Sequence, residues 1–107
     1  MSRFSEVLER LAATIQARKG ADLAESYTAQ LLADRGRSAK KLAEEAVETA
    51  LAAVSQGDDA IAAESADLIY HWLVLLAATG VDLDAVAARL EAREGRSGLE
   101  EKASRGG

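Results

Sequence analysis

Acidic side chains recur at helical spacing in two segments of this 107-residue chain. The first segment reads Glu44-Glu45-x-x-Glu48 and the second reads Glu64-x-x-Asp67. Because each residue of an α-helix turns by ~100°, Glu44 and Glu48 lie ~40° apart, and Glu45 lies ~60° from Glu48 on the other side. Three carboxylates therefore share one broad face of the first segment, and two share a face of the second.

Carboxylates that converge at one level repel each other unless cations compensate, and oxygen-only ligands are what Mg²⁺ prefers. Protein-bound Mg²⁺ typically keeps several waters and completes its shell with substrate phosphates, so a phosphate ester or phosphoanhydride substrate is expected. The same spacing also fits an ordinary solvated face, because Lys40 and Lys41 precede Glu44 and Glu45 by four residues each. Spacing alone leaves both interpretations open.

A small all-α bundle is expected to position these groups. Glycine just beyond a periodic run is the usual helix stop, and glycines divide the chain into segments with helical periodicity. With Ser2, Ser26 and Asp82 as N-caps, the five predicted helices span roughly Arg3–Arg18, Tyr27–Ala33, Ser38–Ser55, Asp59–Thr79 and Leu83–Arg93. An antiparallel hairpin of the third and fourth helices through Gly57 would bring the two acidic motifs to similar depth.

Apolar periodicity predicts which helix faces are covered. On the third helix, an Ala-rich stripe that would let a neighbouring helix approach closely comprises Ala39, Ala43, Ala46, Ala50 and Val54. On the fourth, the predicted inner face comprises Ile61, Leu68, Trp72, Leu75 and Leu76, and the fifth helix is expected to bury Val86 and Leu90. A chain this small buries a limited core, so the broad apolar faces also predict a homodimer or higher homo-oligomer.

Composition narrows the function classes. The chain has no cysteine, which excludes disulfides, thiolate catalysis and Cys-ligated metals. Its single histidine, His71, excludes Glu-x-x-His di-iron and three-histidine zinc sites and is read as a helix-packing residue. The net charge of −5 argues against nucleic-acid binding. No signal-like segment is present and the strongly apolar run 72–78 is too short to span a bilayer, so a cytoplasmic location without membrane insertion is expected.

The C-terminal residues differ in character from the rest. From Gly95 onward the chain is polar and glycine-punctuated, without helical period. We therefore expect a domain over residues 1–95 and a tail over residues 96–107 that is mobile or ordered by substrate. Basic residues that could bind the phosphates of a polyphosphate substrate include Lys41, Arg96, Lys102 and Arg105.

Four motifs in order resemble the phosphoribosyl-ATP pyrophosphatase family of histidine biosynthesis. They are Ser26-Tyr27-Thr28-Ala29-x-Leu31-Leu32, Lys40-Lys41-x-x-Glu44-Glu45-Ala46-x-Glu48, Glu64-Ser65-Ala66-Asp67-Leu68-x-Tyr70-His71 and the ending Gly95-Arg96-Ser97-Gly98-Leu99-Glu100-Glu101-Lys102-Ala103-Ser104-Arg105. The resemblance covers nearly the whole chain, with no departure in the acidic motifs. It implies an all-α, MazG-like pyrophosphohydrolase that acts as a homodimer or higher oligomer.

The resemblance also implies the reaction and the site. The enzyme would be a phosphoribosyl-ATP diphosphatase that converts phosphoribosyl-ATP and water to phosphoribosyl-AMP and pyrophosphate. The implied Mg²⁺ ligands are Glu45, Glu48, Glu64 and Asp67, and the implied catalytic carboxylates are Glu44, Glu45 and Glu48, where Glu44 is a further ligand or orients or deprotonates water. Substrate contacts are implied for Lys41, Arg96, Lys102 and Arg105.

Two alternative functions stay open from the sequence. A house-cleaning pyrophosphatase of the same superfamily would use the same carboxylates on non-canonical nucleoside triphosphates. A non-enzymatic helical dimerisation module would carry the acidic clusters only as solubilising faces.

Overall fold

The computed structural model describes residues 2–95 and 98–104, which form six α-helices and no strand. Their bounds are α1 Arg3–Ala17, α2 Tyr27–Leu32, α3 Arg35–Ser55, α4 Asp58–Thr79, α5 Leu83–Glu91 and α6 Gly98–Ser104. The all-α prediction is confirmed. The three predicted N-caps are also correct, because the side chains of Ser2, Ser26 and Asp82 accept backbone N–H groups at the starts of α1, α2 and α5.

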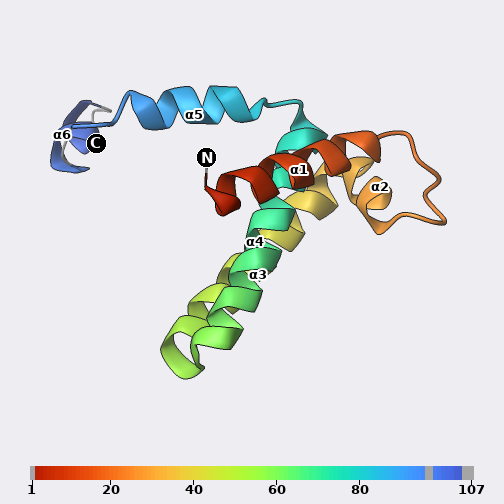
Figure 1. The fold of residues 1–107 in the computed structure, drawn as a ribbon, viewed down its shortest axis with the longest axis horizontal. Helices are drawn as coiled ribbons and strands as arrows, with labels where there is room; N and C mark the ends of the chain where they lie inside the picture. Colours follow the sequence, from red (N-terminus) through yellow and green to blue (C-terminus); the bar gives the residue numbers. More distant parts are fainter. Residues whose placement is uncertain (1, 96–97, 105–107) are drawn as a thin grey trace.

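The central element is an antiparallel hairpin of α3 and α4, as predicted, with Gly57 at the turn (Figure 1). The other end of α4 packs against α1 and α2. There the core comprises Ile15, Leu31, Leu73, Val74 and Ala77. The α4 helix ends at Gly80, whose φ of 77° is left-handed and therefore favours glycine.

One predicted boundary was wrong, and one helix was not predicted. Helix α3 begins at Arg35 rather than Ser38, because the Asp34 side chain accepts the backbone N–H of Arg37 and caps the helix three residues earlier. Gly36 consequently lies in the first turn of α3 and does not separate two helices. The C-terminal residues 98–104 form a sixth helix, whereas no helix was predicted beyond residue 95.

The expected buried faces are only partly covered within one chain. On α4 the fully buried side chains are His71, Leu73, Val74 and Ala77, whereas all five predicted inner residues are half-buried. The Ala-rich stripe of α3 is exposed, because α4 packs on the opposite face, where Ser38, Glu45 and Ala52 are buried. The burial predicted for Leu90 is wrong, since 59% of it is exposed.

Helices α5 and α6 extend from the body as an arm (Figure 1). No residue of α5 is buried. The radius of gyration is 15.9 Å, whereas a compact chain of this length would have about 13 Å. Among the described residues, α5 therefore adds little to the core beyond Leu83, and the outer face of α3 is exposed.

Helix α4 is long and apolar enough, by length and composition alone, to cross a membrane. It is also the helix against which α1, α2 and α3 pack, and it carries Glu64, Asp67 and His71. These features are those of the core helix of a bundle, since ionisable residues are costly inside a membrane.

Candidate metal centre

Three carboxylates from the two helices of the hairpin converge halfway along it. Glu45 and Glu48 lie on α3, one turn apart, and Glu64 lies opposite them on α4. One oxygen of each lies within 4.8 Å of the others. The antiparallel register therefore brings the first and second acidic motifs together.

The hydroxyl of Thr49 ties the two helices together at this level. Its Oγ1 lies 2.8 Å from the carbonyl oxygen of Glu45 and 3.1 Å from that of Glu64. The small side chain of Ala52, fully buried one turn further along α3, allows the helices to stay close. The sequence analysis missed Thr49, although its place four residues after Glu45 on the same helix face could have indicated it.

The cluster is buried unevenly. Glu45 is 8% exposed, Glu64 is half-buried and Glu48 is exposed. Within the described part of the chain, the buried Oε2 atoms of Glu45 and Glu64 have no hydrogen-bond partner. A buried carboxylate oxygen without a donor is costly, so these two oxygens favour the binding of a cation or water.

Burial and like charge act together on these groups. Burial, followed by the proximity of the Glu48 carboxylate, raises the pKa of Glu45, with a smaller contribution from Asp67. The pKa of Glu64 is raised by burial, then by Glu48, then by Asp67. A bound cation would offset both the burial and the like charge, so this environment favours cation binding.

The donor set fits a hard cation such as Mg²⁺. All three groups offer oxygen atoms, and the oxygens around a six-coordinate Mg²⁺, with bonds of about 2.1 Å, lie within about 4.2 Å of one another. The observed limit of 4.8 Å requires only small side-chain adjustments. The exposed side of Glu48 leaves room for waters and for a ligand.

Asp67 and His71 border the cluster on α4. Asp67 lies outside the group of three converging oxygens, although its charge contributes to both raised pKa values. His71 is buried, and its Nδ1 donates to the carbonyl oxygen of Asp67 at 2.9 Å. Because a carbonyl oxygen only accepts, Nδ1 carries a proton, while the buried Nε2 has no hydrogen-bond partner among the described residues.

His71 packs against its neighbour Tyr70, and Tyr70 in turn contacts α2. The two rings meet edge to face with centroids 4.9 Å apart. The hydroxyl of Tyr70 also shares a hydrogen bond with Thr28 at the start of α2. The motif at residues 26–28 is therefore held against the part of α4 that carries Tyr70, one turn beyond Asp67, a link that spacing could not show.

The remaining predicted site residues lie outside the cluster. Glu44 is on α3 beside it, where its carboxylate lies 3.7 Å from Lys41 Nζ. Lys102 lies on α6, at the end of the arm and away from the hairpin (Figure 1). Arg96 and Arg105 lie outside the described residues.

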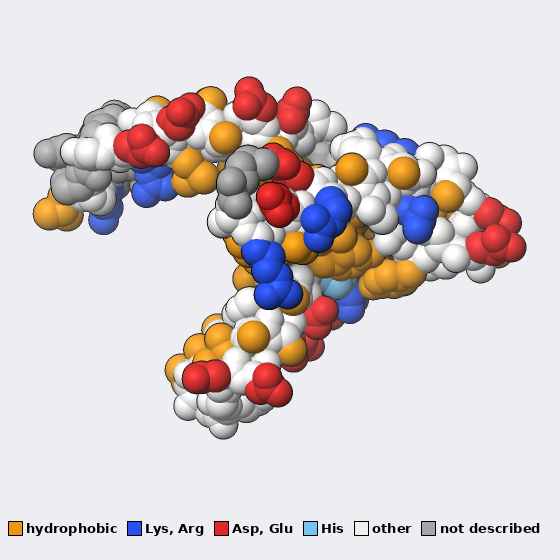
Figure 2. Space-filling view, viewed as in Figure 1, with side chains coloured by type: hydrophobic (Ala, Val, Ile, Leu, Met, Phe, Trp, Pro, Cys, Tyr) orange, Lys and Arg blue, Asp and Glu red, His pale blue; other side chains and the backbone are white. Residues whose placement is uncertain are grey.

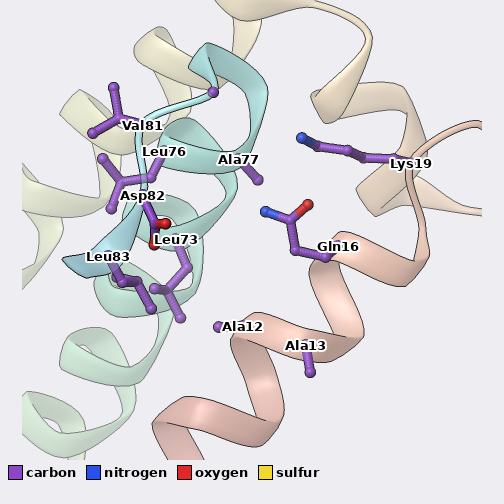
Figure 3. A pocket seen from close by; sticks show the side chains of 11 residues that line it. Ala12, Ala13, Gln16, Lys19, Leu73, Leu76, Ala77, Val81, Asp82 and Leu83 are labelled. Atoms are coloured by element: carbon purple, nitrogen blue, oxygen red, sulfur yellow. The ribbon is translucent and has the colours of Figure 1, made fainter. Parts of the chain in front are cut away.

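A separate cavity of about 430 Å³ lies between α1, the end of α4 and the start of α5 (Figure 3). Gln16, Lys19 and Asp82 are its polar side chains, and the rest of its lining is apolar or glycine. It shares no residue with the carboxylate cluster.

Fold and centre together define a class: small all-α proteins in which a helical hairpin presents a cluster of carboxylates that could hold a metal ion. Residues 8–94 match the family model described as phosphoribosyl-ATP pyrophosphohydrolase. The chain belongs to this family.

Individual relatives cover almost the whole chain. It is 70% identical to the phosphoribosyl-ATP pyrophosphatase of Caulobacter vibrioides (strain NA1000 / CB15N) over 103 residues, which are 96% of each chain. It is 57% identical to the protein of that name from Parvibaculum lavamentivorans, over 99% of this chain and 98% of the relative. It is 51% identical to the one from Paramagnetospirillum magneticum, over 98% of this chain and 97% of the relative.

Proposed function

We propose that this protein hydrolyses phosphoribosyl-ATP to phosphoribosyl-AMP and pyrophosphate, the second step of histidine biosynthesis, and that it requires Mg²⁺. The observation that carries the proposal is the cluster of Glu45, Glu48 and Glu64, with two buried oxygens that have no donor. The family match and the relatives named phosphoribosyl-ATP pyrophosphatase support the substrate.

The proposed Mg²⁺ ligands are Glu45, Glu48, Glu64 and Asp67. When bound, the cation would neutralise phosphate charge and stabilise the leaving pyrophosphate. Glu45 is buried and Glu64 is half-buried between the two packed helices, which limits where their carboxylates can lie. Asp67 joins the set through its position on the same helix as Glu64, one turn further on.

Glu44 is the proposed group that orients or deprotonates the attacking water. It adjoins Glu45 in sequence, is exposed, and lies 3.7 Å from Lys41 Nζ. In the reaction, the water oxygen forms a new bond to phosphorus while the bridging bond between the α- and β-phosphates breaks. The water proton passes to a carboxylate and pyrophosphate leaves. Lys41 is the proposed cation beside the phosphates.

The C-terminal segment is proposed to complete the substrate site. Under this proposal residues 1–95 form the hydrolase domain, and residues 96–107 contribute Arg96, Lys102 and Arg105 to phosphate or ribose binding. Lys102 lies on the helix at the end of the arm, away from the hairpin. Its contact with substrate would therefore require either movement of the arm or a second subunit.

We further propose that the protein is a cytoplasmic homodimer. Large apolar side chains are exposed along one face of α3, where Val47, Leu51 and Val54 are 59%, 55% and 82% exposed. A separate apolar groove, of about 250 Å³, lies between α1 and α4 and is lined by Phe4, Val7, Leu8, Leu11, Ala66 and Ile69. Figure 2 shows hydrophobic side chains on the hairpin and in the hollow beside it. Such faces are normally covered by protein.

A substrate comparison tests the proposal. Purified protein with Mg²⁺ is expected to release pyrophosphate from phosphoribosyl-ATP at a far higher kcat/KM than from dITP or dCTP. The opposite order would assign the protein to house-cleaning of non-canonical nucleotides. No pyrophosphate from any of the three would refute an enzymatic role for the cluster.

A further inference from the structure

A positively charged side chain near the start of α3, Arg37, was not among the expected site residues. The side chain of Arg37 reaches across to α2, where its guanidinium carbon lies 5.5 Å from the centre of the Tyr27 ring. Its Nη1 donates to Oε1 of Gln30 at 3.3 Å. A stacking contact and a hydrogen bond thus hold this long side chain in one orientation.

Among the side chains that the structure describes, no carboxylate lies within 4.0 Å of the Arg37 guanidinium; the ion pair found there joins Lys41 to Glu44. Asp34, the nearest acid in sequence, uses its carboxylate to cap the backbone N–H of Arg37. In a chain with a net charge of −5, an ordered guanidinium without a carboxylate partner is available to an anionic ligand.

Two structural links connect Arg37 to the metal centre. Along α3, Arg37, Lys41 and Glu45 follow at intervals of four residues, so each lies ~40° around and about 6 Å along the helix from the one before. Through α2, Tyr27 adjoins Thr28, whose hydroxyl bonds Tyr70 next to His71. The ridge of α3 therefore runs from the carboxylates past two cations.

We propose that Arg37, supported by Tyr27 and Gln30, is a phosphate-binding residue for the substrate; this inference rests on the function proposed above. A ligand held at the carboxylates and extended along α3 passes Lys41 and reaches the guanidinium, whose fork of N–H donors matches phosphate oxygens. The phosphate could belong to the pyrophosphate end of the substrate or to its phosphoribosyl end.

Binding measurements with each product distinguish the pyrophosphate end of the substrate from its phosphoribosyl end. Titration calorimetry with magnesium pyrophosphate and, separately, with phosphoribosyl-AMP would be carried out on the wild type, Arg37→Met and Arg35→Met. Arg35 is the matched control, since it is exposed, lies in the same turn and contacts only the carbonyl oxygen of Thr79 at 3.5 Å. We expect Arg37→Met to weaken one of the two ligands roughly tenfold, as for loss of a charge-assisted hydrogen bond at an exposed site.

Weaker binding of pyrophosphate assigns Arg37 to the leaving group, and weaker binding of phosphoribosyl-AMP assigns it to the retained product. Unchanged affinity for both, an equal loss in Arg35→Met, or no detectable binding of either ligand to the wild type would overturn the inference. Tyr27→Leu is expected to weaken the same ligand by a smaller factor, because the cation remains but its support is lost.

Kinetics provide a second readout. With phosphoribosyl-ATP, Arg37→Met should raise KM while kcat stays within about twofold, and Arg37→Lys should recover part of the loss. If the wild type does not hydrolyse phosphoribosyl-ATP, the proposed function fails, whereas the calorimetry still decides the role of Arg37. If hydrolysis is normal and the affinities do not change, only the inference about Arg37 fails.

Discussion

Replacing Glu45 by Gln should stabilise the metal-free protein and remove its response to Mg²⁺. Glu45 is buried, its Oε2 atom has no partner, and its nearest charged neighbour is Glu48. At the 4.8 Å limit of the cluster, two unit charges repel by about 0.9 kcal/mol with the dielectric constant of water and about 3.5 kcal/mol at an effective value of 20. Because Glu48 is exposed, solvent screens the repulsion, and the lower value, for the dielectric constant of water, applies.

Neutralising Glu45 should therefore raise the free energy of unfolding by about 1 kcal/mol, or Tm by about 5 °C for a chain of this size. In the wild type, Mg²⁺ at ten times its Kd should add about 1.4 kcal/mol, and in Glu45→Gln it should add nothing. Thermal unfolding in EDTA and in MgCl₂, at one protein concentration, measures both effects.

The control variant is Glu44→Gln, which removes a neighbouring exposed carboxylate outside the cluster and should shift the metal-free stability by less than about 0.5 kcal/mol. A lower Tm for metal-free Glu45→Gln, or an Mg²⁺ shift equal to that of the wild type, would refute the assignment of Glu45 as a cation ligand.

Three further predictions concern pH, assembly and the C-terminal segment. Because the pKa values of Glu45 and Glu64 are raised in the folded state, that state binds more protons than the unfolded chain above the ordinary carboxyl range. These groups therefore destabilise the metal-free protein as pH rises above the ordinary carboxyl range. The Mg²⁺-induced Tm shift should shrink as pH falls toward that range, because protons then compete with the cation; a constant shift would contradict this. Light scattering should give a dimer mass for the wild type and a monomer mass for Leu51→Glu, whereas a monomeric wild type at micromolar concentration would remove the dimer from the account. Deleting residues 96–107 should leave the helical circular dichroism nearly unchanged and raise KM for phosphoribosyl-ATP, so an unchanged KM would exclude the segment from the site.

Local rules predicted much of the fold. Ser2, Ser26 and Asp82 were recognised as caps because their side chains satisfy the first N–H groups of a helix within a few residues. The hairpin followed from the short connection at Gly57. The start of α3 was missed because Gly36 resembles a helix stop, whereas the capping carboxylate of Asp34 outweighs the low helix propensity of that glycine.

Other features depend on contacts that periodicity does not specify. The Ala-rich stripe of α3 and Leu90 of α5 have the pattern of buried residues, yet they are exposed in the single chain. Periodicity indicates that a face is apolar, and it does not say whether the same chain or another covers it. The convergence of Glu45, Glu48 and Glu64 was expected from the hairpin register, but the bridging Thr49 and the contact of Arg37 with Tyr27 required the positions of neighbouring helices.

The most direct test of the central claim is pyrophosphate release from phosphoribosyl-ATP by the wild type and by the folded double variant Glu48→Gln, Asp67→Asn. With Mg²⁺ the wild type should turn over, and EDTA should abolish the activity. The double variant, with its helical circular dichroism retained, should lose at least about a hundredfold in kcat/KM, because it removes two of the four proposed ligands. Undiminished hydrolysis by the folded double variant would contradict the claim that these carboxylates carry the reaction.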